Sequence, residues 1–250
     1  MSLAREAVRM CVVRALRGNT WAAARVRDSE QGPIEDYFSD KALPEILVFT
    51  DDGMFGGGNG PRDLFAGGDQ DLIIEVVVTS RMKSDDGEWV EPLVTDASME
   101  FTIGVIQRQI KAALVDPQNA WAEMFRRFAL TVNESKDRRG SSMRDGVRYA
   151  GRQLLLSLTL PKDPVPGVAL GPLWTDFLAM VDADADLVKI APVLRGAIEG
   201  DVGDMPEWVI MQGAYGRTRA EARSLLSNTD RVLESSEGSE PVNTAPEQPE

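Results

Sequence analysis

The sequence predicts an α+β protein with a C-terminal helical extension and a disordered acidic tail. Two hydrophobic patterns predict the α+β class. Apolar residues three or four apart in some segments indicate helices, and alternating or continuous apolar residues in other segments indicate strands. The chain has 250 residues, of which 43% are hydrophobic, so it is long enough to bury one sizeable core. Strand patterns stop after residue 161, and apolar residues become scarce after residue 227.

Two segments in the first half of the chain have helical spacing. In residues 4–16, small and aliphatic side chains lie on one side and arginines on the other, and Gly18 follows as a stop. In residues 99–114, aliphatic side chains step by three and four behind Asp96, a candidate N-cap, and Pro117 follows. Both segments are predicted to be amphipathic helices.

Five segments are predicted to form strands: residues 24–29, 46–49, 72–78, 125–135 and 151–161. The segment 46–49 is apolar on both faces, which is typical of an interior strand, and Asp51, Asp52 and Gly53 are expected to end it. With 72–78 it predicts an antiparallel pair, because a single loop joins the two. The last two segments alternate apolar and polar residues, so each is expected to have one solvated face.

The glycine-rich stretch GMFGGGNGPRDLFAGG, residues 53–68, is the most enzyme-like part of the chain. It lacks the lysine and hydroxyl of a phosphate-binding loop, and it leads into a predicted strand instead of a helix. A long hairpin loop fits better. Phe55, Leu64 and Phe65 are unusual in a purely solvated loop, so they are candidate interface residues of an arm that docks on a partner.

Several acidic residues imitate catalytic or metal sites. Asp182, Asp184 and Asp186 have the spacing of a calcium loop, but its sixth and twelfth positions are Leu187 and Val193. An inter-helix loop with Asp184 or Asp186 as an N-cap is the better interpretation. The adjacent aspartates at 51–52 and 85–86 lie next to glycines at strand ends, as turn residues do.

The composition argues against catalysis or metal binding through histidine or cysteine. The chain has no histidine, which is the commonest general base and metal ligand. Its single cysteine, Cys11, lies on an apolar helix face, where a buried hydrophobe is expected. A serine–lysine site is not excluded by composition, although nothing around Ser135 and Lys136 argues for one. We therefore predict no catalytic residue, no metal and no cofactor.

The charge is uneven along the chain. The formal net charge is −13, which argues against binding nucleic acid through a general basic surface. Residues 228–250 carry six acidic residues and one arginine, so −5 of the −13 lies there, and this tail is predicted to be disordered. Residues 136–150 were expected to link two strands and to form a local positive patch, whose candidate interface residues are Arg138, Arg139, Arg144 and Arg148.

Three regions are predicted: an α/β domain at 1–161, a helical extension at 162–227 and the acidic tail at 228–250. The extension follows a stretch rich in proline and glycine and contains three short helical patterns. The N-terminus lacks the uninterrupted apolar centre of a signal peptide, and no run reaches the length of a membrane helix. We expect a protein made in the cytoplasm, with no membrane partner.

The order of these segments resembles the tail terminator proteins of tailed bacteriophages, the group that includes the lambda minor tail protein that stops tail elongation. The resemblance covers residues 3–161 and is carried by ARVRDS followed by LPEILVFTDDG, then DLIIEVVV, and Trp121 ahead of FALTVNES and RQLLLSLTLP. The long glycine insertion departs from the family's compact pattern.

The resemblance implies a small, mostly antiparallel sheet flanked by helices. It also implies a structural virion protein at the head–tail junction: a homo-oligomer, in the form of a hexameric ring, that caps the tail tube protein, stops elongation and docks the head–tail connector or neck. DNA would pass through its lumen without specific binding. The alternatives are another neck or tail-completion protein and, from a different class, a small-molecule enzyme with carboxylate or Ser/Lys chemistry.

Overall fold

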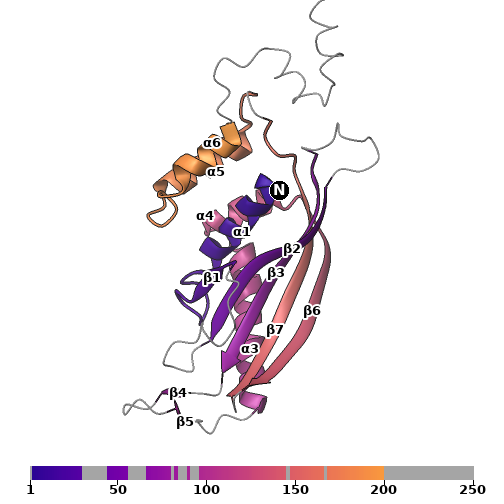
Figure 1. The fold of residues 1–250 in the computed structure, drawn as a ribbon, viewed down its shortest axis with the longest axis vertical. Coiled ribbons are helices and arrows are strands. Elements are labelled where there is room, and N and C mark those ends of the chain that lie inside the picture. Colours follow the sequence, from indigo (N-terminus) through magenta and orange to yellow (C-terminus); the bar gives the residue numbers. More distant parts are fainter. Residues whose placement is uncertain are drawn as a thin grey trace, which may run out of the picture.

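A five-stranded mixed sheet with helices against one of its faces forms the centre of the protein (Figure 1). This is the α+β class that the sequence predicted. The structure is a computed structural model, and it describes residues 2–29, 44–55, 66–79, 82–83, 89–90, 96–144, 147–165 and 168–199. The predicted acidic tail, the third helical pattern and most of the glycine-rich stretch lie outside these residues.

The strands of the sheet lie in the order β1 (Val26–Asp28), β2 (Glu45–Phe55), β3 (Gly68–Thr79), β7 (Val147–Leu160) and β6 (Thr131–Arg144). Only β1 and β2 are parallel; the other neighbours are antiparallel. The predicted pairing of the second and third strands is confirmed. A separate pair, β4 (Met82–Lys83) and β5 (Trp89–Val90), flanks residues 84–88, which lie outside the described residues.

One face of the sheet supplies half of the main core. Paired residues of neighbouring strands share a face, and here the shared residues are aliphatic across three strands. Val48 pairs with Ile74 and Ile74 with Leu154, while Leu72 pairs with Leu156. All five are buried and belong to the main apolar cluster. A central strand with aliphatic residues at every second position has to face packed helices, because that surface is otherwise exposed to water.

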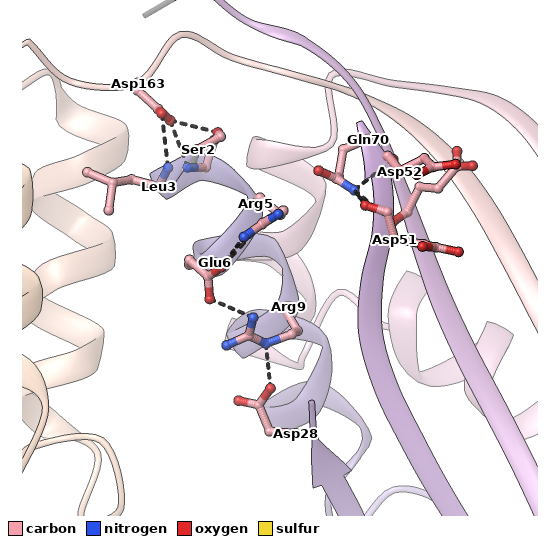
Figure 2. A network of polar contacts seen from close by, with 12 residues as sticks. Ser2, Leu3, Arg5, Glu6, Arg9, Asp28, Asp51, Asp52, Gln70 and Asp163 are labelled. Carbon is pink, nitrogen blue, oxygen red and sulfur yellow. Dashed lines mark hydrogen bonds and ion pairs between the residues drawn. The ribbon is translucent and has the colours of Figure 1, made fainter. Parts of the chain in front are cut away.

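Three helices, α1 (Leu3–Leu16), α3 (Asp96–Val115) and α4 (Ala120–Phe128), cover this face (Figure 1). The two predicted amphipathic helices are confirmed as α1 and α3, with Asp96 as the first residue of α3. After α1 the chain turns at Gly18, whose φ of +77° is strained for other residues. Asp163, far along the sequence, caps α1 by accepting hydrogen bonds from the N–H groups of Leu3 and Ala4 and the hydroxyl of Ser2 (Figure 2).

Two further helices, α5 (Pro172–Ala183) and α6 (Ala191–Glu199), form an outer layer on α1 and α4 (Figure 1). Edge-to-face contacts between aromatic rings join α5 to α4: the Phe128 ring centroid lies 5.0 Å from that of Trp174 and 5.4 Å from that of Phe177. Pro192 is the second residue of α6, where its missing N–H costs no hydrogen bond.

Three sequence predictions about the strands were wrong. Residues 125–128 end helix α4, so the fourth strand begins at Thr131 instead. Residues 136–150 were predicted to be a link, but residues 136–144 belong to β6 and residues 147–150 to β7. The second strand does not end at Asp51; a bulge between Thr50 and Gly53 lets β2 continue to Phe55.

The bulge in β2 is stabilised by a buried side chain that donates hydrogen bonds to its backbone carbonyls. The amide nitrogen of Gln70 donates to the carbonyls of Asp51 and Asp52, each at 2.9 Å (Figure 2), and to its neighbour Asp71 at 3.0 Å. Gln70 is buried, so these bonds replace those that the extra residue removes from the ladder.

Candidate interaction surface

Strand β6 lies at one edge of the sheet (Figure 1). Among the described strands it pairs with β7 alone, along one side. Every residue from Thr131 to Arg139 is exposed. The leucines of β7 require a covered strand, whereas β6 has polar residues on both faces, which suits an edge.

The hairpin of β6 and β7 brings the four predicted arginines into one structure. Arg138 and Arg139 lie on β6 and pair with Gln153 and Arg152. Arg144 pairs with Val147 and Arg148 with Met143, so these two lie at the closed end of the hairpin. The residues of the predicted positive patch therefore lie on paired strands instead of in a link.

The predicted apolar interface residues lie elsewhere. Phe55 is the last residue of β2 and pairs with Gly68, which in turn pairs with Leu160 at the end of β7. Arg144 ends β6 and Arg148 lies near the beginning of β7, at the opposite end of the sheet. Leu64 and Phe65 fall outside the described residues. The two groups of predicted interface residues thus do not form one surface through Phe55.

Ion pairs attach the hairpin to helix α3. The Glu100 carboxylate lies 3.1 Å from Arg139 and 3.0 Å from Arg152, and Arg152 lies 3.5 Å from Asp137. The amide of Gln107 also donates to Asp137 at 3.2 Å. The sequence pattern did not indicate this network, because its members are separated along the chain and none is apolar.

Arg138 differs from its neighbour Arg139. Adjacent strand residues point to opposite faces, so Arg138 points away from α3, toward the face that carries no helix among the described residues (Figure 1). Its guanidinium makes no ion pair with any residue that the structure describes, and it is exposed. This places an uncompensated positive charge on the open edge.

The opposite edge of the sheet is only partly closed. β1 pairs with Ile46, Leu47 and Val48 of β2, and the last bond runs from the N–H of Ser29 to the carbonyl of Val48. Beyond Val48, no described strand lies along the outer side of β2. The side chains of Asp51 and Asp52 are exposed there, without an ion-pair partner in the described part of the chain.

The face of the sheet away from the helices holds a smaller apolar group, namely Leu47, Ile73, Val77 and Leu155. Glu75 lies among these positions, half-buried and paired across the strands with Leu47 and Gln153. Burial raises the pKa of the Glu75 carboxyl above its ordinary range, although a hydrogen bond with Gln153 works in the other direction.

Helix α3 carries an open groove of about 500 Å³ on its outer side, lined by Gly104, Gln107, Arg108, Lys111, Ala112 and Val115. All six residues belong to one helix. No second element encloses the groove among its lining residues, so it does not have the form of a pocket that buries a small molecule.

The calcium-like aspartates are neutralised by arginines. Arg14 lies 2.5 Å from both Asp184 and Asp186, and Arg195 lies 2.5 Å from Asp182. Burial disfavours the Arg14 charge, but its hydrogen bonds and Coulomb attraction to both aspartates outweigh burial, so the pKa of Arg14 is raised. Asp184 also accepts the N–H groups of Asp186 and Leu187, so it caps the turn that precedes α6.

The described residues offer no site for a metal or a reactive thiol. No group of three His, Cys, Asp or Glu side chains among them could hold a metal ion. Cys11 is fully buried in α1, and this burial raises the pKa of its thiol, which keeps it protonated.

No protein-family model matches the chain, and no curated protein matches it. Within the part of the chain that the structure describes, no helix is long and apolar enough to cross a membrane.

Proposed function

We propose that the protein is a structural component of a phage particle, a tail terminator at the head–tail junction. In this role it forms a ring that caps the terminal ring of the tail tube, stops elongation and docks the neck with its other face. The resemblance of its segment order to that family motivates the proposal. The observation that carries it is the open edge at β6, where residues 131–139 are all exposed in a chain with a large, well-packed core.

An open edge of this length suits a protein that works by association. Unpaired N–H and C=O groups along an edge strand can pair with a strand of another chain. Monomeric proteins normally keep such edges short or covered. A ring needs heterologous interfaces that close by rotation, and an edge strand is one surface from which such an interface is built.

The acidic composition fits passage of DNA through a ring. Each copy carries a formal charge of −13, and a channel lined by acidic residues repels DNA phosphates, so the genome slides through without sticking. This part of the proposal concerns where the charge lies in the assembled ring. A lumen lined by basic residues would contradict it.

The proposal is tested in a phage that carries the gene. Deletion of the gene is expected to give tails of uncontrolled length that do not join heads, and supply of the protein in trans restores their length. Electron microscopy with an antibody against the protein is expected to label one end of purified tails. Tails of normal length that fail to join heads would identify another neck or tail-completion protein. Absence of the protein from virions would refute both assignments.

A further inference from the structure

We propose that the open edge of β6 in one copy of this chain pairs in antiparallel fashion with residues 49–55 of β2 in the next copy. The sheets of neighbouring subunits would then be continuous around the assembly. The inference rests on the proposed function, because a tail terminator has to form a ring. It identifies the partner of the open β6 edge as a second copy of the same chain.

The sheet has two open edges of different kinds. On one side, β6 runs for 14 residues, and among the described strands only β7 lies beside it. On the other side, the three residues of β1 cover β2 only up to Val48, and Thr50 to Phe55 continue without an outer partner among the described strands. Each edge leaves backbone N–H and C=O groups that another strand satisfies.

The direction of the strands permits this pairing without turning a subunit over. β2, β3, β7 and β6 are antiparallel from one to the next, so β6 runs opposite to β2 within one chain. When a second copy is placed beside the first in the same orientation, its β2 runs antiparallel to the first copy's β6. This is the more stable of the two ladder types, and it is a heterologous contact of the kind that builds rings.

The two edges have opposite charge. Residues 131–144 contain four basic and two acidic residues, a net +2, whereas residues 49–55 contain Asp51, Asp52 and no basic residue, a net −2. Pairing β6 with β6, or β2 with β2, would bring like charges together, which costs free energy and disfavours those contacts. Pairing β6 with β2 brings opposite charges together.

The charges are also available for a partner. Lys136 is engaged by Glu134 at 2.6 Å and Arg139 by Glu100 at 3.1 Å, which leaves Arg138 without an ion pair in the described region. Asp51 and Asp52 use their backbone carbonyls for Gln70 but leave their carboxylates exposed. Arg138 and these two aspartates are the complementary charges that the proposal joins.

The edge residues also explain why the edges do not pair at random. Charged side chains and bulges on an edge strand disfavour pairing with unrelated strands, and β6 has both, with a register shift between Val132 and Glu134. A strand of complementary charge removes the repulsive part of this barrier, so the same features select one partner.

The first test is site-directed cross-linking of the purified full chain. Met54→Cys and Lys136→Cys are combined in one variant, and a flexible bismaleimide is added at protein concentrations where light scattering detects assembly. The native Cys11 is buried and stays unreactive. Met54 and Lys136 are both exposed, and an antiparallel pair that places Arg138 opposite the bulge at Asp51 and Asp52 places them opposite each other. The within-chain register puts Met54, Asp69 and Thr159 on the face of the sheet that also holds Lys136 and Leu155. We expect a ladder of covalent multimers from the double variant and only monomer from each single variant.

Each result decides the matter. Dimers from either single variant would show pairing between like edges and would overturn the proposal, as would a double variant that assembles without a ladder or a protein that does not assemble. This test uses purified protein, so its result does not depend on whether the protein is a tail terminator. A ladder of cross-linked multimers from a protein that is absent from tails would support the pairing of β6 with β2 and refute the tail-terminator role.

A charge exchange tests the pairing a second way. Arg138→Glu and Asp51→Arg are each expected to raise the concentration needed for assembly roughly tenfold, because each brings like charges together. The double variant is expected to restore assembly. Lys111→Glu on the outer side of α3 is the matched control and is expected to leave assembly unchanged. Circular dichroism confirms folding. Failure of the double variant to recover while remaining folded would overturn the proposal.

Discussion

The two edges of the sheet differ in what the rest of the chain does for them. The edge at β1 is only three residues long and is tied to helix α1, because the Arg9 guanidinium lies 2.5 Å from the Asp28 carboxylate and Arg17 donates to the carbonyl of Val26 at 3.2 Å (Figure 2 shows the first contact). The edge at β6 is 14 residues long, and β7 is its only partner within the described part of the sheet.

The two edges of the sheet therefore contribute differently to folding. Side chains that close the β1 edge contribute to the folding of a single chain. Side chains on the outer part of β6 contribute little to folding, because most of their surface remains in water. Substitutions should therefore lower the free energy of unfolding on the helix-covered side and at β1, but not at β6.

The largest effect is expected at Phe128, which anchors the outer helices to the core. Phe128→Ala removes a fully buried ring that contacts Trp174 and Phe177, and we expect the free energy of unfolding to fall by about 3–5 kcal/mol. Urea unfolding followed by tryptophan fluorescence measures the loss. A loss below that of an exposed substitution such as Phe101→Ala would show that α5 and α6 do not share the core.

The next effect concerns the bulge in β2. Gln70→Met keeps the side-chain volume but removes the hydrogen bonds that this buried amide donates to three backbone carbonyls, so we expect a loss of about 1–3 kcal/mol. Gln118→Met, on an exposed surface, is the matched control and should change stability little. Equal urea midpoints for the two variants would show that Gln70 does not hold the bulge.

A smaller effect is expected where β1 meets α1. Asp28→Ala removes the partner of Arg9, but Arg9 keeps its ion pair with Glu6 at 2.5 Å, so we expect a loss of about 1 kcal/mol. The loss should shrink as salt concentration rises, because salt screens half-exposed ion pairs. Thermal unfolding at low and high salt checks this, and a salt-independent loss would point to packing instead of charge.

A gain in stability is expected from Glu75→Gln. Burial raises the pKa of Glu75 in the folded state above its ordinary value of 4.5, so the folded protein binds this proton more tightly than the unfolded chain. The wild type therefore loses stability as pH rises from below the ordinary value through the folded pKa. The variant should lack this loss and be more stable than the wild type at pH 7, but not at pH 3. Urea unfolding at both pH values measures the difference.

The smallest effect on folding is expected at the open edge. Arg138→Ala should change the free energy of unfolding by less than about 0.5 kcal/mol, because the side chain is exposed and has no ion pair in the described residues. Urea unfolding of Arg138→Ala and of Asp28→Ala, measured side by side, compares the loss of stability at the two edges. A loss at Arg138 as large as that at Asp28 would remove the distinction between them.

The core of the fold was predictable because its residues repeat at a structural period. The aliphatic positions of residues 4–16 and 99–114 gave both helices, and the apolar runs at 46–49 and 72–78 gave the central strand pair. These patterns are visible in the sequence because each element buries one face against the same core.

The outer hairpin strand was not predictable in the same way. Residues 136–144 are polar on both faces, so they lack the alternation that marks a strand, and pairing with β7 decides their conformation. Helix α4 was missed because Phe128, Leu130 and Val132 alternate across its end. Asn119 was the available signal, since its side chain accepts the N–H groups of Trp121 and Ala122 at the start of the helix.

Part of the candidate surface followed from charge alone. Arg138 and Arg139 stand out as basic residues in an acidic chain, and both lie on the exposed edge. Their different roles did not follow, because the partner of Arg139 is Glu100 on a distant helix. The open part of β2 also escaped prediction, since adjacent aspartates followed by glycine are typical of a turn, and the bulge depends on Gln70.

The clasp between Asp163 and the start of α1 has a consequence for synthesis on the ribosome. Ser2 and Asp163 are 161 residues apart in the sequence, and translation at about 5–20 residues per second separates their appearance by roughly 10 to 30 s. Helix α1 is thus made well before the residue that caps its first turn. Until Asp163 has been added, the N–H groups of Leu3 and Ala4 lack the acceptor that they have in the folded protein.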